Sequence, residues 1–391
     1  MRGHHARRPA KTRKNGKPLL RDRLWVRIMA GALSIFLVIV GWSVGHALTA
    51  PGGGTISERL AEWARGHYLG PLVTFGEWLT YSPPKKGGKP SFSFTGGPSA
   101  SAAAMARQKR LAALYAPPAS LKPFVAHPLA GEGKWRVLAV AHNEPAIFGT
   151  YLRPSSVYSS YVSGIAEMNP ALVKFYLHPG SEDPGPGLWH SPSYIPPGGR
   201  RDLVATFNSG FKIDVSGGGF YLNGVTRGTL TRGTATIVYY KDGHIAIGNW
   251  GEGGLTMSPD VAGVRQNLHL IVQGGRIPGS VNHNVTTQWG ATLGGGYYVW
   301  RSGIGMTKTG RVIFVYGPAL NVQELAALLQ RAGAITAMQL DINPDWMSYM
   351  YYLPKGHPNN PTPETLLPDQ MQPANRYYSP ASRDFTAVYA R

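Results

Sequence analysis

Two aspartates lie four positions apart in the segment Asp341-Ile-Asn-Pro-Asp345-Trp346, which directly follows an apolar run. Two carboxylates around a proline-fixed turn could share a proton, hold a cation such as calcium, or contact sugar hydroxyls. The spacing also begins an EF-hand loop, but Trp346 stands where that loop requires glycine and Tyr352 where it requires glutamate. A turn capped by Asp341, with Asp345 in solvent, explains the same residues without any function.

Three more segments place polar side chains beside glycines at the ends of predicted strands. They are Phe207-Asn208-Ser-Gly210-Phe211, Gln273-Gly274-Gly275-Arg276 and Trp300-Arg301-Ser-Gly-Ile-Gly305. Glycine lets a ligand approach the backbone closely, and the planar guanidinium of Arg301 could bind two phosphate oxygens at once. In such local sequences an Asn like Asn208 is most often a turn former, and a lone Arg like Arg301 is usually a solvated surface residue.

Short strands are the elements that must position these residues. From residue 134 onward, short apolar runs rich in β-branched and aromatic residues are bounded by Gly and Pro, a pattern typical of strands. Asp242-Gly243 predicts a hairpin between residues 234–240 and 244–247. Thr309-Gly310 predicts a second hairpin, between residues 303–306 and 312–316.

A helix is predicted over Asn321–Gly333. Asn321 can cap its first turn together with Glu324, a leucine stripe follows, and Gly333 stands where a left-handed terminating residue belongs. The helix leads into an apolar strand that ends at Asp341. A polar residue at such a junction is well placed for chemistry, because strand ends border the loops that bind ligands.

The composition indicates a large, strand-rich globular part. The chain has 391 residues, of which 43% are hydrophobic, with 50 Gly, 32 Pro and no Cys. The many glycines and prolines favour a turn-rich fold over a helical bundle. The absence of cysteine excludes disulfides, thiolate zinc sites and cysteine nucleophiles. We therefore expect an α+β fold with few helices.

Basic residues are concentrated at the amino terminus. Residues 1–27 contain ten Lys and Arg against one acidic residue, whereas the whole chain carries a net charge of +19. Residues 28–50 form an apolar run long enough to cross a membrane as a helix, and the basic flank predicts a cytoplasmic amino terminus. A cleaved secretory signal is the alternative. Because the orientation of a membrane helix explains the basic arm, and the folded part is expected outside the cytoplasm, we expect no nucleic acid partner.

The remainder of the chain divides near residue 119. Residues 51–118 are rich in Pro, Gly and Ser, with short helical stretches at 56–68 and 101–115, which predicts a spacer. Residues 119–391 carry the strand pattern and are expected to form one domain outside the cytoplasm.

The order of these motifs over residues 200–391 resembles the phosphodiester glycosidase family. Members typically carry Asn-Gly-Gly-Phe-Phe, and Asn208-Ser-Gly210-Phe211 keeps three of those residues. Members carry Arg-Thr-x-x-Gly, which Arg301-Ser-Gly-Ile-Gly305 resembles. The family's Asp-Gly-Gly-Gly-Ser is retained here only at Asp341, since Ile342-Asn-Pro-Asp345 replaces the rest. Proline has no N–H, so this segment cannot offer the family's row of backbone donors to a phosphate.

The resemblance implies a hydrolase of a sugar–phosphate bond in an envelope or exported polysaccharide. By this resemblance Asp341, Arg301 and Asn208 would be catalytic, and all three should meet at one rim. A further set would bind substrate: Gly210, Gly274, Gly275, Gly305, Asp345, Trp346 and Trp300. The alternative is a protein that keeps the fold but only binds or assembles polysaccharide. A surface that binds anionic polymer by charge alone is a third hypothesis.

Overall fold

The computed structural model describes residues 24–50, 55–91, 117–185, 187, 189–282, 286–290, 292 and 296–391. The chain divides into two compact units, residues 1–50 and 51–391. In the first unit, helix α1 (Leu24–Thr49) contains an apolar stretch over Trp25–Thr49 that is long enough to cross a membrane. Most of the basic arm, and the helix expected at 101–115, lie outside the described residues.

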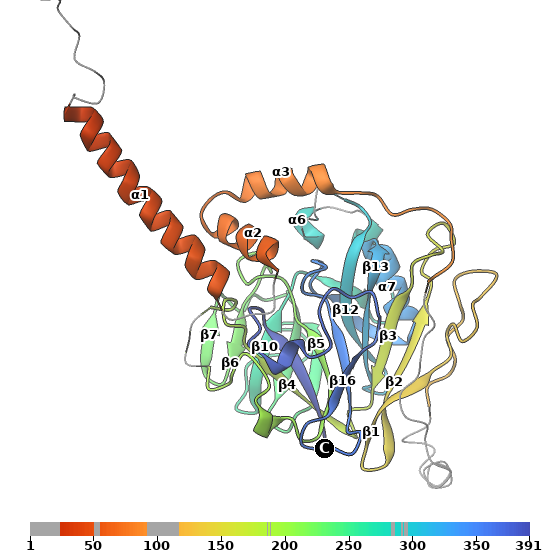
Figure 1. Ribbon diagram of the computed structural model, residues 1–391. Coiled ribbons are helices and arrows are strands. Elements are labelled where there is room, and N and C mark those ends of the chain that lie inside the picture. Colours follow the sequence, from red (N-terminus) through yellow and green to blue (C-terminus); the bar gives the residue numbers. More distant parts are fainter. Residues whose placement is uncertain are drawn as a thin grey trace, which may run out of the picture. The chain divides into compact units, whose positions relative to one another are not determined.

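Three antiparallel sheets form most of the second unit (Figure 1). The first has seven strands in the order β1 (Arg136–Ala141), β2 (Glu144–Leu152), β3 (Ser163–Met168), β13 (Val312–Leu320), β12 (Val299–Thr307), β14 (Ala334–Gln339) and β11 (Leu270–Gln273). The second has five: β7 (Val225–Arg227), β6 (Phe220–Leu222), β10 (Val261–Gln266), β8 (Ala235–Tyr240) and β9 (Ile245–Asn249). The third also has five: β16 (Thr362–Thr365), β15 (Tyr349–Leu353), β5 (Leu203–Asn208), β17 (Phe385–Ala390) and β4 (Val173–His178).

Helices are few among the described residues of this unit. There the α-helices are α2 (Ile56–Gly66), α3 (Gly70–Thr80), α6 (Thr286–Trp289) and α7 (Val322–Arg331), and the 3₁₀ helices are η2 (Pro197–Gly199), η3 (Gly279–Asn282) and η5 (Arg376–Tyr378). The fold is therefore the strand-rich α+β architecture that the sequence predicted.

The helix predicted after Asn321 is confirmed. Asn321 Oδ1 accepts the backbone N–H of Glu324, and the Glu324 carboxylate accepts the N–H of Asn321, so both ends of the capping box are formed. Gly333 has φ +96°, the left-handed conformation expected after a helix end. The leucines of α7 pack on the seven-stranded sheet in a buried cluster. Both predicted hairpins are also present, as β8–β9 and β12–β13.

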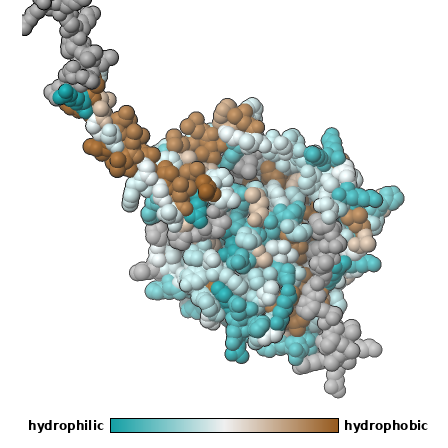
Figure 2. Space-filling view, in the orientation of Figure 1, coloured by the Kyte–Doolittle hydropathy of each residue, from teal (hydrophilic) through white to brown (hydrophobic). Residues whose placement is uncertain are grey.

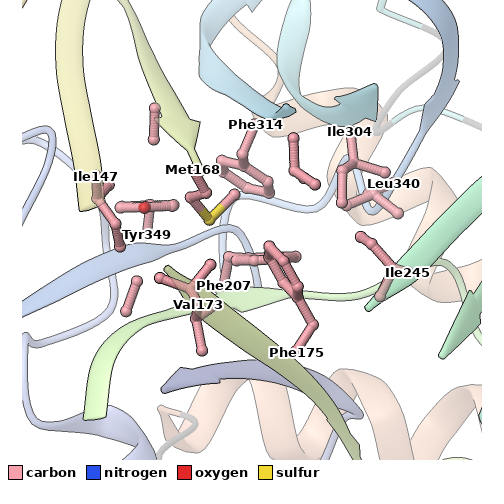
Figure 3. Close-up of a cluster of buried hydrophobic side chains, with 14 of the residues drawn as sticks. Ile147, Met168, Val173, Phe175, Phe207, Ile245, Ile304, Phe314, Leu340 and Tyr349 are labelled. Carbon is pink, nitrogen blue, oxygen red and sulfur yellow. The ribbon is translucent and has the colours of Figure 1, made fainter. Parts of the chain in front are cut away.

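A large apolar cluster joins the sheets (Figure 3). Phe207 of β5 packs on Phe314 of β13 with ring centroids 4.9 Å apart, and Phe314 packs on Tyr349 of β15 at 5.3 Å. Burying each of the two phenylalanine side chains stabilises the fold by roughly 1.5–3 kcal/mol. This packing fixes the end of β5 relative to the seven-stranded sheet.

The region expected to be a spacer contributes to the second unit. Its described part, residues 55–91, contacts loops of the sheet region instead of standing apart from it. Lys212 Nζ lies 2.6 Å from Glu62 Oε2, and Tyr81 donates its hydroxyl hydrogen to the carbonyl of Tyr298 at 3.2 Å. Composition could not predict this packing, because a few ion pairs and one aromatic ring make these contacts.

Candidate functional site

Strand ends from two sheets meet at one place in the second unit. In the third sheet, β5 ends at Asn208, and β17 begins beside it with Phe385 paired to Asn208. The segment that follows β14 of the first sheet comes to the same place, because Asp341 donates its backbone N–H to the carbonyl of Ser209 at 3.1 Å. Both polar strand ends that the sequence singled out are therefore neighbours.

Asn208 is buried and its side chain is fully engaged. Its Oδ1 accepts the backbone N–H of Ser348 at 3.1 Å, and its Nδ2 donates to Ser302 Oγ and to the carbonyl of Ser209, both at 2.9 Å. Ser302 Oγ in turn donates to the backbone carbonyl of Asp341 at 2.8 Å. Asn208 thus connects β5, β12 and the segment after β14, and it holds this corner in one geometry.

The Asp341 carboxylate is buried beside an arginine. Its Oδ1 accepts the backbone N–H groups of Ile342 at 2.7 Å and Asn343 at 3.0 Å, and Arg383 Nη2 lies 3.4 Å from its Oδ2. Burial raises the pKa of Asp341, although Arg383 and the two backbone N–H groups offset part of that rise. A carboxyl group in this state can exchange a proton at a pH closer to neutrality than a solvated aspartate.

Arg301 precedes Ser302 in β12 and points to the opposite face of that strand. It is fully buried, and it donates from Nε to the carbonyl of Leu320 at 3.0 Å and from Nη1 to Gln339 Oε1 at 2.9 Å. Burial lowers its pKa to about 10. Within the described residues, its Nη2 has no hydrogen-bond partner. Successive residues of a strand point to opposite faces, so Arg301 and Ser302 diverge, and the Ser302 hydroxyl is the one that reaches Asp341.

Among the described residues, three other cations border the pocket that contains Asp341: Arg383, Lys212 and Arg65, the last of which is paired with Glu77. This pocket has a volume of about 320 Å³, and Trp346 also lines it. Helix α2 supplies an anion at the same position: Glu62 lies 2.6 Å from Lys212 Nζ and 3.8 Å from Arg383 Nη1. Burial alone would lower the pKa of Arg383, but the surrounding carboxylates, Asp341 first among them, raise it. The guanidinium therefore stays charged.

Asp345 borders a second pocket, next to the first, of about 330 Å³. Its carboxyl group is hydrogen-bonded to that of Glu58 at the start of α2. Burial and, after it, the nearby Glu58 and Asp341 carboxylates together raise the pKa of Asp345 to about 7. From the sequence, Asp341 and Asp345 could share a proton, but the principal carboxylate neighbour of Asp345 is Glu58, which comes from the supposed spacer.

The predicted tryptophan and glycine residues have different surroundings. Trp346 lines both pockets, and the guanidinium of Arg376 lies 5.2 Å from its ring centroid. Trp300 packs on the apolar cluster of the sheets. Gly210 approaches Asn267, and a Cβ there would lie 3.0 Å from the Asn267 side chain.

The remaining predicted glycines are explained by backbone geometry. Gly274 and Gly275 form the turn after β11 with φ +57° and +75°. Gly305 fits against Ala334 and Ala337, where a Cβ would come within 2.9 Å of each.

The sequence did not identify Arg383, Lys212 or the two glutamates of α2. The available signal for Arg383 was the charged pair Arg383-Asp384 directly before an apolar strand. Asp384 forms a fully buried ion pair with Arg265 at 2.7 Å, which anchors the segment that carries Arg383. In the described part of the chain, no group of three or more His, Asp or Glu side chains is arranged to hold a metal ion.

Comparison with known proteins agrees with the motifs at this site. The family model of the phosphodiester glycosidases matches residues 201–343, which include Asn208, Arg301 and Asp341. This part of the chain is a phosphodiester glycosidase domain. The match ends two residues before Asp345. Arg383 also lies outside it, so the phosphodiester glycosidase domain and the segment that precedes β17 build the site together.

Two solved structures are similar to this phosphodiester glycosidase-containing chain. One is the catalytic domain of zebrafish N-acetylglucosamine-1-phosphodiester alpha-N-acetylglucosaminidase, auto-inhibited by its pro-peptide, with 15% identity over 70% of this chain and 96% of that one, at a TM-score of 0.39. The other is a hypothetical protein from Synechocystis, with 12% identity over 64% and 63% of the chains, at a TM-score of 0.36. A search of the curated proteins gave no match.

Proposed function

We propose that the protein hydrolyses a sugar–phosphate bond, with Asp341 as its acid–base group and Arg383 and Lys212 as its phosphate ligands. The observation that carries this proposal is the pocket in which a buried carboxyl group with a raised pKa lies beside two cations. The guanidinium of Arg383 can bind two phosphate oxygens, and Lys212 adds a second charge. We assign phosphate binding to Arg383 and Lys212 and not to Arg301, because the first two line the pocket together with Asp341.

Hydrolysis at this site would proceed as follows. Water attacks the sugar carbon that carries the phosphate, the bond between that carbon and the phosphate oxygen breaks, and the phosphate leaves as a monoester. Protonated Asp341 gives its proton to the departing oxygen, and the two cations stabilise the negative charge that develops there. The attacking water becomes the sugar hydroxyl, and the proton that it loses returns to Asp341 and restores the acid. Asn208 acts by holding Ser302 and the Asp341 backbone in place, since its own polar atoms are already hydrogen-bonded.

Glu62 defines the resting state of this site. Its carboxylate lies where the phosphate of a substrate would meet Lys212 and Arg383, so α2 must move before an anionic substrate binds. We propose on this ground that residues 55–80 restrict access of an anionic substrate to the pocket that contains Asp341.

Helix α1 would anchor the protein in a membrane, with the basic arm in the cytoplasm and residues 51–391 outside. The support for this is its apolar length and the ten Lys and Arg residues that precede or begin it. Cleavage as a signal sequence is the alternative, and the mass of the mature amino terminus decides between them. An intact amino terminus in the membrane fraction supports the anchor.

A substrate panel tests the proposed reaction. The full chain in detergent micelles would be incubated with several sugar-1-phosphodiesters, with and without calcium, and sugar release followed. We expect Asp341→Asn and Arg383→Met each to lower the rate at least about 100-fold. The matched controls Asp242→Asn and Arg201→Met, at exposed positions, should keep the full rate. No release from any diester, or full activity of Asp341→Asn, would contradict the assignment.

One observation favours a second function, polysaccharide binding without hydrolysis. The backbone N–H groups of Ile342 and Asn343 already donate to Asp341, and Pro344 has none, so this segment presents fewer donors to a phosphate than a glycine loop would. Oligosaccharide binding by calorimetry, together with no hydrolysis in the panel, would establish this alternative.

A further inference from the structure

Helix α3 has an apolar face that points away from the sheets. Leu72, Phe75 and Leu79 follow one another at helical spacing and are 66%, 58% and 62% exposed. Trp78 lies beside them, and its ring stacks on that of Phe75 with centroids 6.0 Å apart. Figure 2 shows this face as a patch of hydrophobic surface. Large apolar side chains gathered in this way on a surface mark a docking site.

The opposite face of α3 is already engaged. Glu77 forms an ion pair with Arg65 of α2, and Thr74 and Glu77 line the pocket that contains Asp341. Glu77 is also the single charged residue in the sequence of α3, so the outward face carries no charge. The helix cannot turn its leucines inward without breaking the ion pair, and the apolar face therefore stays outside.

We propose that this face of α3 lies on the surface of a lipid bilayer, in the plane of the interface. The inference rests on the proposal that α1 crosses the membrane, because only residues 50–69 separate the two helices in the sequence. Tryptophan and phenylalanine are favoured at membrane interfaces, and leucines insert among the acyl chains. A sugar-binding platform would need hydrogen-bonding groups beside its rings, whereas leucines flank Phe75 on this face.

The chain contains no cysteine, so one introduced cysteine carries an environment-sensitive fluorophore at a single position. Leu79→Cys places the label on the α3 face, and Val157→Cys places it at a 49% exposed position elsewhere in the same unit as a control. The full chain would be reconstituted in vesicles that contain lipids with a nitroxide near the headgroup. We expect the label at 79 to be quenched at least about twofold more than the label at 157.

A second variant shows whether α3 itself is responsible. Phe75→Ser with Trp78→Ser, in the Leu79→Cys background, should bring quenching down to the level of position 157, while the chain stays in the vesicles after alkaline carbonate washing. Equal quenching at 79 and 157, or quenching that survives the double substitution, would overturn the inference. Disulfide-linked dimers of Leu79→Cys in vesicles would overturn it as well, because they would assign the face to a second copy of the chain.

The anchor and the docking face can fail separately. If alkaline carbonate releases the unmodified full chain, the anchor proposal is wrong. The labelled Leu79→Cys and Val157→Cys chains would then be mixed with preformed vesicles, which tests the α3 face alone. Quenching at position 79 but not at position 157 would still support lipid docking.

Discussion

The hydrogen-bonded carboxyl groups of Asp345 and Glu58 join helix α2 to the segment after β14, and this contact should weaken as pH rises. Asp345 is the group whose pKa is raised to about 7, so in the folded protein it holds its proton near neutral pH. An asparagine at position 345 is uncharged at every pH and can still donate a hydrogen bond to Glu58. Asp345→Asn therefore isolates the effect of the charge.

The sign and size of the change in unfolding free energy follow from the difference in the pKa of Asp345 between the unfolded and folded states. Asp345 is protonated in both states below pH 3.8, so its contribution is then fully present, and that contribution is lost as pH rises toward and through 7. A rise from 3.8 to about 7 corresponds to at most about 4 kcal/mol of unfolding free energy. Because Asp345 is only half-buried, solvent screening reduces this to about 1–2 kcal/mol.

Thermal unfolding of the full chain in micelles, at a series of pH values from 4 to 8, measures this difference. We expect Asp345→Asn to equal the wild type at pH 4 and to be more stable by about 1–2 kcal/mol at pH 8, a few degrees in Tm. Asp260→Asn, at an exposed position, is the matched control and should follow the wild type throughout. Parallel stability curves for the wild type and Asp345→Asn would refute the reasoning.

Three further changes have defined outcomes. Glu62→Gln should tighten the binding of inorganic phosphate about fivefold, as measured by calorimetry. The reason is that an ion pair of about 1 kcal/mol between Glu62 and Lys212 no longer competes with phosphate. Unchanged affinity would show that Glu62 does not occupy the phosphate position. Arg265→Met should destabilise the fold by about 3–5 kcal/mol in denaturant unfolding, since Asp384 would stay buried without a partner. Asn321→Ala should cost about 1 kcal/mol in the same assay through loss of the cap of α7, and an unchanged midpoint would argue against the capping box.

Local patterns in the sequence were sufficient for much of the fold. The cap and leucine stripe of α7, the Asp-Gly turn between β8 and β9, and the apolar run of α1 each depend on interactions between residues close in the chain. The order of the strand-end motifs also identified the phosphodiester glycosidase domain, because that order follows from the chain itself.

The composition of the site depended on contacts that no local pattern encodes. Arg383 reaches Asp341 because β17 pairs with β5 across 177 positions of sequence, from Asn208 to Phe385. Glu62 and Glu58 reach the site from a segment whose composition is typical of a spacer.

Arg383, and not Arg301, lies beside the Asp341 carboxylate. Arg301 donates to Gln339 instead, because it points to the other face of β12. The sequence determined which residues end the strands. Arg301 and Ser302 are both buried, but they are neighbours on β12 and point to opposite faces, and of the two only Ser302 donates to Asp341. Only the tertiary structure decided which charges share the pocket, since ion pairs in a buried site join side chains that are distant in the chain and close in space.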